Sequence, residues 1–190
     1  MANRHVTNET IAAYANAAID GANAAGGREA VVEVRNQMLQ ILEYIATNIE
    51  LRLSLDDESY TAEEREKLAR NVFDGFDPLL VELLAVMASR QDATLFRRVC
   101  SSYEELIESK LNFNVVDVTT VVDLDDNLRT VITDKAESDL GRDVVLVEHL
   151  DPSIKGGIIM STRGRYVDAS VATQLDRARL VLKQKDGGEC

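Results

Sequence analysis

The spacing of apolar residues changes near Lys110, and this change constrains the fold more than any other feature of the chain. Before that point, apolar residues recur every three or four positions, as on one face of a helix. After it come runs rich in β-branched residues that alternate loosely, which is typical of strands. We therefore predict a mainly α protein with a small α/β part. An N-terminal bundle of five or six helices covers residues 1–110, a C-terminal α/β domain with a short β-sheet covers residues 111–183, and residues 184–190 form a flexible tail.

Capping residues mark the helix boundaries in the first half. Thr7 is the candidate N-cap of the first helix, and Gly26-Gly27 ends that helix. The later helix starts are marked by the capping box Thr61–Glu64, by Asp77 followed by Pro78, and by Asp92. These signals predict consecutive helices joined by short links, which is the pattern of a compact bundle.

The second half alternates between strand and helix signals. A strand is predicted over "FNVVDVTTVVDL" (113–124), then a helix that ends at Gly141, then a second strand over "DVVLVEHL" (143–150). A hairpin follows, with its turn at Arg163-Gly164. Asp168 is the predicted cap of a last helix, whose apolar side is formed by Val171, Leu175, Ala178 and Leu182.

Charge limits the possible partners. The 190 residues carry a net charge of −12, and 45% of them are hydrophobic. Nucleic acids and anionic membrane surfaces both require clustered Lys and Arg, so the sequence argues against either as a direct partner. An acidic chain instead favours protein partners that bring basic segments.

Neither a membrane span nor a targeting segment is expected. There is no run of 18 apolar residues, and the first twenty residues lack an apolar core and carry Glu9 and Asp20 against one arginine. The two cysteines, Cys100 and Cys190, form no C-x-x-C pair, which indicates a reducing compartment. Cys100 lies in an apolar helical stretch and is expected to be a buried structural thiol.

The glycine-rich stretch "DPSIKGGIIMSTRGRYVDASV" (151–171) raises the question of a phosphate site. A P-loop would need Lys and Ser or Thr after its last glycine, and a dinucleotide site would need G-x-G-x-x-G between a strand and a helix. Neither is present. We predict instead that Asp151-Pro152 starts a turn and that Gly156-Gly157 lets a neighbouring backbone approach closely. No cofactor and no metal are expected.

Other functions stay open on the residues alone: a calcium-responsive or generic helical adaptor, and an uncharacterised enzyme that uses residues 149–170. A calcium-responsive adaptor would use Asp123, Asp125, Asn127 and Asp134, although Leu128 occupies the place of the loop's glycine. An enzyme of unknown type would use His149, Asp151 and Asp168 beside the hairpin. The simpler interpretation of the first cluster is a set of carboxylates that cap a helix.

Read from end to end, the chain resembles the delta subunits of F-type ATP synthases, the family of the mitochondrial oligomycin-sensitivity conferring protein. The resemblance covers about residues 7–182. It rests on "AYANAAID", on the central segment from Leu79 to Ile107, and on a C-terminal signature. The signature residues, for which a structural role is expected, are Asp151, Pro152, Gly156, Gly157, Asp168 and Ser170. The chain departs from the family pattern in residues 114–126 and in the hairpin "STRGR".

The resemblance implies a non-catalytic stator subunit that links the catalytic head to the peripheral stalk, so that rotor torque from ion flow is coupled to ATP synthesis. The implied partners are the N-terminal helix of an alpha subunit, held in a groove between two helices of the bundle, and the b subunits of the stalk. Membrane contact would occur only through the complex. The implied location is the cytoplasmic face of a bacterial plasma membrane.

Two features of the residues fit a groove for a helix. The helix over residues 78–89 is apolar around much of its circumference, and the first helix is rich in alanine, which permits close approach. Filling of the bundle core is the alternative role for these same side chains. The predicted groove residues are Tyr14, Ala15, Ala18, Ile19, Leu80, Leu83, Leu84 and Met87.

Overall fold

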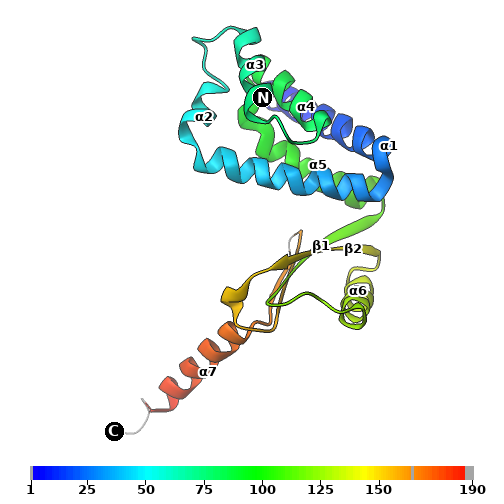
Figure 1. Ribbon diagram of the computed structural model, residues 1–190, viewed down its shortest axis with the longest axis vertical. Coiled ribbons are helices and arrows are strands. Elements are labelled where there is room, and N and C mark those ends of the chain that lie inside the picture. The colour runs from blue at the N-terminus through cyan, green and yellow to red at the C-terminus, as the bar shows by residue number, and fades with distance from the viewer. Residues whose placement is uncertain (1, 164, 187–190) are drawn as a thin grey trace. The chain divides into compact units, whose positions relative to one another are not determined.

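The structure, a computed structural model, describes residues 2–163 and 165–186, and the side chains of residues 7–163 and 165–182 (Figure 1). The chain divides into two compact units, residues 1–111 and residues 112–190. The first unit is helical, and the second combines a four-stranded sheet with helices. The predicted fold class, mainly α with a small C-terminal α/β part, is confirmed.

The first unit opens with a long, broken helix. Helix α1 (Ala2–Thr47) is interrupted at Gly26 and Gly27, where the backbone leaves helical geometry and Gly27 takes a positive φ of 63°. The predicted end of the first helix is thus a break between two halves of α1 (Figure 1). The predicted start at Thr7 is wrong, because the helix already begins at Ala2: no proline or glycine precedes Thr7 to stop it.

Short helices complete the bundle. They are α2 (Ile49–Ser54), α3 (Ala62–Val72), α4 (Pro78–Ser89), the 3₁₀ turn η1 (Ala93–Leu95) and α5 (Phe96–Lys110). The predicted capping box is confirmed, since Thr61 and Glu64 exchange side-chain to backbone hydrogen bonds at the start of α3. Asp77 caps α4 by accepting a hydrogen bond from the Leu79 N–H, with Pro78 in the first turn.

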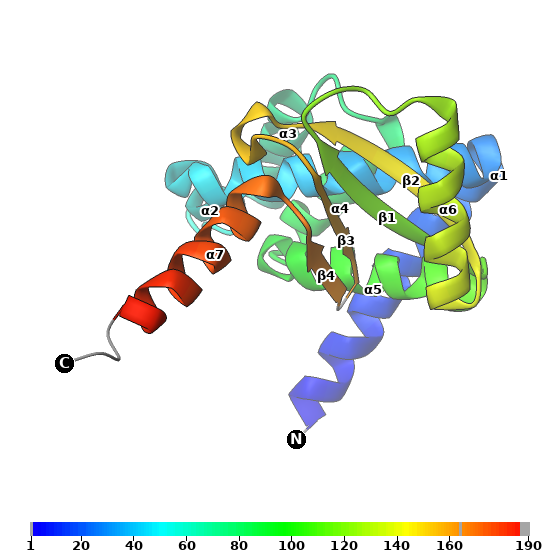
Figure 2. The same cartoon turned by 90° about the horizontal axis from the view of Figure 1, so that it is seen from below.

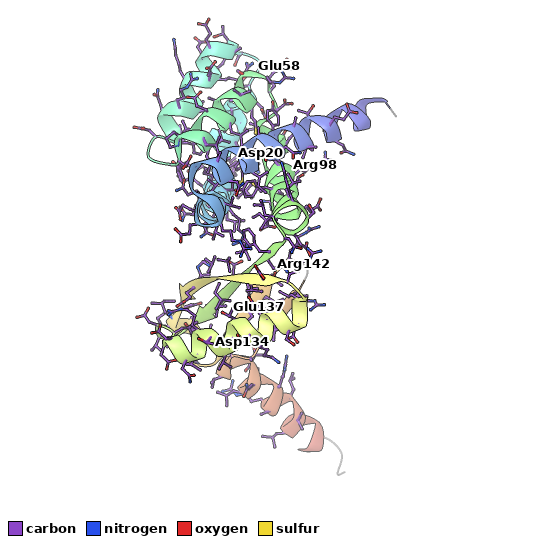
Figure 3. All side chains as sticks on the ribbon, turned by 90° about the vertical axis from the view of Figure 1, so that its right-hand side faces the viewer. Asp20, Glu58, Arg98, Asp134, Glu137 and Arg142 are labelled. Atoms are coloured by element: carbon purple, nitrogen blue, oxygen red, sulfur yellow. The ribbon has the colours of Figure 1, made fainter. Side chains whose placement is uncertain are left out.

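The core of the bundle forms where α5 packs along α1 and where α3 packs on α4. Tyr103 of α5 is fully buried, and its hydroxyl donates to the Val31 carbonyl oxygen at 3.0 Å, which ties α5 to the second half of α1. Polar pairs also join α1 to α5: Arg98 donates to Asn8, and Lys110 pairs with Asp20. Figure 3 labels Arg98 and Asp20.

The second unit is built on a sheet with strand order β2-β1-β3-β4. Strands β1 (Phe113–Thr120) and β2 (Asp143–Leu150) are parallel, whereas β3 (Ile158–Thr162) and β4 (Arg165–Asp168) continue the sheet in antiparallel fashion. The first strand is shorter than predicted because the chain turns after Thr120, whose hydroxyl donates to the Val122 carbonyl oxygen.

Helix α6 (Asp126–Leu140) connects the two parallel strands and runs along one face of the sheet (Figure 2). Its Ala136 packs with Val116, Val118 and Leu124 to form the buried centre of this unit. Gly141, in the left-handed conformation, ends α6 as predicted.

Helix α7 (Val171–Asp186) follows β4 and extends away from the sheet of its own unit (Figure 1, Figure 2). It includes residues 184–186 of the predicted tail, because Lys and Gln favour helix and no breaker occurs before Gly187. Residues 187–190 of that tail, and Gly164 of the predicted hairpin turn, lie outside the described residues. None of the described helices is both long enough and apolar enough to cross a membrane.

Candidate partner-binding surfaces

The predicted groove residues lie almost entirely in the bundle core. Seven of the eight are buried, and the most exposed of the seven, Leu83, keeps only 9% of its surface. Each sits on the face of α1 or α4 that packs against the other helices, so it has little surface to offer a partner in this conformation. These buried residues are Ala15, Ala18, Ile19, Leu80, Leu83, Leu84 and Met87.

Tyr14 is the exception, because it is half-buried at the edge of α1. Its hydroxyl donates to a carboxylate oxygen of Asp92 at 2.9 Å, which joins α1 to the link between α4 and α5. Burial, and secondarily Asp92, raise the pKa of Tyr14 to about 12. The hydroxyl therefore stays protonated at neutral pH and acts as a donor.

This contact corrects the prediction that Asp92 caps the next helix. The Asp92 side chain makes no cap bond. The free N–H groups of Ala93 and Thr94 instead donate to the two carboxylate oxygens of Asp56, at 3.0 and 2.9 Å. A residue 37 positions earlier supplies the cap, and sequence spacing alone gives no signal of that.

Helices α1 and α4 do meet, and exposed residues flank the line of contact. A Cβ atom at Gly21 would lie 2.8 Å from the side chain of Leu79, so the two helices approach closely there. Beside that point Ala17 is exposed, Leu79 is half-buried, and Val86 is 44% exposed. We call Tyr14, Ala17, Gly21, Leu79 and Val86 the α1–α4 seam. Sequence reasoning overlooked Val86 as a surface residue because the apolar residues of α4 cover more than one of its faces.

The C-terminal signature residues hold the backbone in tight turns. Asp151 accepts from the Ser153 N–H at 2.8 Å, and Pro152 opens a 3₁₀ turn. Gly157 has φ of +79°, and a Cβ there would lie 2.4 Å from the Ala169 carbonyl oxygen, so only glycine fits. The predicted close backbone approach at Gly156-Gly157 is confirmed by the hydrogen bond from the Val171 N–H to the Gly156 carbonyl oxygen, at 2.9 Å.

Asp168 and Ser170 share the start of α7. The Ser170 hydroxyl accepts from the Thr173 N–H at 3.2 Å and provides the cap that the sequence assigned to Asp168. Asp168 instead accepts from the Ser170 N–H at 2.9 Å and from the Thr173 hydroxyl at 2.8 Å. Bonds from Ser170 first, and then from Thr173, hold the pKa of Asp168 below its usual range.

Helix α7 carries apolar side chains that its own unit does not cover. Leu175 is 50% and Leu182 is 63% exposed, and together with Val171 they lie on one face at helical spacing. The helix is also locally basic: residues 171–186 contain four Lys or Arg and two Asp, a net charge of +2 in a chain of −12. We call Val171, Leu175, Ala178 and Leu182 the α7 stripe.

A small apolar cleft lies between α6 and the β3–β4 hairpin. It has a volume of about 90 Å³. Leu140 and Ala136 line it from α6, and Met160 and Val167 line it from the hairpin. An apolar side chain of a partner could enter it.

The residues named for the two alternative functions do not come together in a site. His149 lies 3.2 Å from a carboxylate oxygen of Asp117 on the neighbouring strand, while Asp151 and Asp168 are bonded to their own turns. In the proposed calcium segment, Asp125 caps α6 by accepting from the Leu128 N–H at 2.7 Å. Among the described residues, no three His, Cys, Asp or Glu side chains gather where a metal ion could be held.

Cys100 is buried in α5, as expected. Burial first, and then the nearby charge of Glu104, raise the pKa of its thiol to about 12. The thiol is therefore protonated and unreactive at neutral pH.

Comparisons with known proteins agree on one family. The family described as ATP synthase delta (OSCP) subunit matches residues 11–182. An ATP synthase subunit delta of Prochlorococcus marinus (strain MIT 9301) is 26% identical over 179 residues, which cover 93% of this chain and 98% of the relative. An ATP synthase subunit delta of Rhodopirellula baltica is 28% identical over 183 residues, which cover 91% of this chain and 80% of the relative.

A solved structure shares the fold. A chain in the Toxoplasma gondii mitochondrial ATP synthase hexamer aligns with a TM-score of 0.50 at 20% identity, over 90% of this chain and 96% of that one. The family match spans both units, from the first half of α1 into α7. The chain belongs to the ATP synthase delta (OSCP) subunit family.

Proposed function

We propose that this chain is the stator subunit that joins the catalytic head of a bacterial F-type ATP synthase to its peripheral stalk. The observation that carries the proposal is the family match over residues 11–182. The subunit is non-catalytic, and its work is to transmit force between two partners. It acts at the cytoplasmic face of the plasma membrane, which it reaches through the complex.

The helical unit binds the head through the N-terminal helix of an alpha subunit, which lies along the α1–α4 seam. Leu79 and Val86 are seven residues apart and therefore share one face of α4. Across from them, Ala17 and Gly21 of α1 present little side chain, so a partner helix can approach closely. This is the arrangement that recognises an amphipathic helix through residues at helical spacing.

Val86 is the residue to change in a test of head binding. We expect Val86→Asp to weaken binding of a synthetic alpha-subunit N-terminal peptide about tenfold or more, because a buried apolar contact is replaced by a charge. Fluorescence anisotropy with the full chain measures the affinity. Leu83→Asp is unsuitable, because Leu83 is buried and the change would damage the core.

Leu53→Asp on α2 provides the matched control. Leu53 is 64% exposed, more than Val86, and lies outside the seam. It should leave peptide affinity unchanged, and both variants should keep the circular dichroism spectrum of the original chain. Equal affinity of Val86→Asp and the original chain would overturn the assignment of the seam.

The C-terminal unit binds the b subunits of the stalk through the α7 stripe and the cleft between α6 and the hairpin. The stripe offers Leu175 and Leu182 to a second helix, and its basic flank attracts an acidic one. Slow dissociation under rotor torque requires contacts of this apolar kind.

Leu175→Asp tests this contact against Leu180→Asp. Both leucines are at least half exposed, but Leu180 lies on the opposite side of α7 from the stripe. We expect Leu175→Asp to abolish co-purification with b subunits and Leu180→Asp to retain it. If both variants are retained equally, α7 does not bind the stalk in this way.

A further inference from the structure

A second apolar pocket lies in the helical unit, and none of its lining residues belongs to the α1–α4 seam. It has a volume of about 160 Å³ and opens between the second half of α1, α2, η1 and the start of α5. Leu42 and Ile45 of α1 and the buried Phe96 of α5 form its apolar lining. Arg52 and Arg97 also line it, from α2 and α5 respectively.

The volume limits what can enter. A cavity of about 150 Å³ accommodates one benzene-sized group, whereas sites for drug-sized ligands have about 300–1,000 Å³. The pocket therefore suits one leucine or phenylalanine side chain and is too small for a lipid chain or a nucleotide.

The two arginines give the pocket wall a positive charge. In the described part of the chain, neither the Arg52 nor the Arg97 guanidinium makes a hydrogen bond or an ion pair. Neighbouring arginines are engaged: Arg98 donates to Asn8 at 2.7 Å and Arg90 pairs with Asp92. Two arginines that no described carboxylate pairs with therefore lie beside one apolar pocket, in a chain of net charge −12.

The carboxylate of Asp56 lies close to the pocket, but its oxygens already accept hydrogen bonds. Both oxygens of Asp56 accept from the N–H groups of Ala93 and Thr94, which belong to the pocket wall. With Asp56 counted, the wall keeps a net positive charge. Guanidinium groups bind carboxylates with two parallel hydrogen bonds, so the chemistry that matches this wall is acidic.

We propose that this pocket anchors one leucine- or phenylalanine-sized side chain of an acidic segment in a partner protein, while Arg52 and Arg97 bind carboxylates on either side of it. An aliphatic or aromatic anchor in a pocket, with a polar rim whose hydrogen bonds are satisfied, is the arrangement that a specific binding interface needs. This site is separate from the α1–α4 seam and does not depend on what binds there.

The test uses a fluorescein-labelled helical peptide with a single leucine and with glutamates one turn before and one turn after it. The full chain should bind this peptide, and the double variant Arg52→Gln/Arg97→Gln should bind it about tenfold more weakly or worse. Ala46→Trp, at an exposed position of the pocket wall, should block binding by filling the pocket.

Controls separate the pocket from general charge attraction. Arg98→Gln, one residue along α5, should leave affinity within about twofold, because the Arg98 guanidinium is bonded to Asn8 and does not line the pocket. Peptides with the leucine changed to serine, or the glutamates to glutamine, should bind at least about tenfold more weakly. The binding of the alpha-subunit peptide should not change in the Arg52 and Arg97 variants.

Three results would overturn the proposal. In the first, the chain binds the control peptides as tightly as the original peptide. In the second, Arg98→Gln loses as much peptide affinity as Arg52→Gln/Arg97→Gln. In the third, octanoate binds as tightly as the peptide. The last result would mean that the pocket serves a free alkyl carboxylate rather than a protein segment.

Discussion

Buried Arg65 shows how one charged side chain can organise several loops. Only 6% of it is exposed. Its guanidinium donates to the carbonyl oxygens of Ala88 and Ser89 at the end of α4, at 2.9 and 3.1 Å, and to those of Asp57 and Tyr60 before α3. Sequence spacing gives no signal of this burial. Its interior role follows from the carbonyl groups that tertiary packing brings together.

Arg65→Met should therefore lower the free energy of unfolding of the helical unit by about 3 kcal/mol, because several buried carbonyl oxygens lose their donor. Urea unfolding followed by circular dichroism measures the change. Arg70→Met is the control: Arg70 forms exposed ion pairs with Glu66 and Glu82, and solvent screening makes the contribution of such pairs to stability small. Similar losses in the two variants would contradict the role given to Arg65.

Gly157 is constrained both by its φ angle and by lack of space. Gly157→Ala should destabilise the C-terminal unit by about 3 kcal/mol or more, because the new methyl group would overlap the Ala169 carbonyl. Gly141→Ala isolates the contribution of the backbone angle: its φ is also positive, at +69°, but nothing lies within 4 Å of an added Cβ. It should cost only about 1 kcal/mol in the same urea experiment. Equal costs would show that space is not limiting at Gly157.

At the scale of elements, the start of α7 links helix stability to pH. The pKa of Asp168 is lowered in the folded chain by bonds from Ser170 and Thr173. Its stabilising contribution is therefore fully present above the unfolded-state pKa of about 4 and is lost as the pH falls through the lower, folded-state pKa.

Asp168→Asn should consequently make the stability of the C-terminal unit less sensitive to acid. The measurement compares urea unfolding of the original chain and the variant at neutral pH and at pH values below about 4. The free energies of unfolding of the original chain and the variant should differ at neutral pH and converge in acid. A constant difference at all pH values would mean that the Asp168 charge does not contribute.

Helices α4 and α7 also show which apolar side chains stay exposed once the chain has packed. In α4 the apolar residues point in nearly all directions, and the core takes Leu80, Leu84 and Met87 while Val86 stays at the surface. In α7 the stripe residues Leu175 and Leu182 stay at least half exposed. In the proposed function, partners bind the apolar surface that remains after the chain's own packing is complete.

At the scale of the whole molecule, the division into two compact units suits the proposed function, in which one subunit holds two partners. If the proposed function is correct, loss of either contact should release the head from the stalk. Membranes with Val86→Asp or Leu175→Asp should then hydrolyse ATP while ATP-driven ion pumping falls severalfold. Phosphate release and a fluorescent ion-gradient probe measure the two activities. A parallel fall in both would indicate a damaged head rather than uncoupling.

Much of the architecture could be predicted from local sequence patterns. The break at Gly26-Gly27, the capping box of Thr61 and Glu64, and the second strand all appear where the sequence indicates them. The family was also identified from the sequence, because the resemblance rests on local motifs along residues 7–182, and the family match over residues 11–182 confirms it. Capping and turn formation depend on neighbours within a few positions, so one sequence contains the information needed.

The contacts between distant segments were decided by the tertiary structure alone. Periodicity identified the apolar residues of α1 and α4 but not which of them the bundle would bury, and the eight predicted groove residues are mostly core. It could not reveal that Asp56 would cap η1, or that Arg65 would be buried among carbonyl groups. The physical reason is that the burial of a side chain depends on what packs over it, and those neighbours come from parts of the chain with no fixed spacing in sequence.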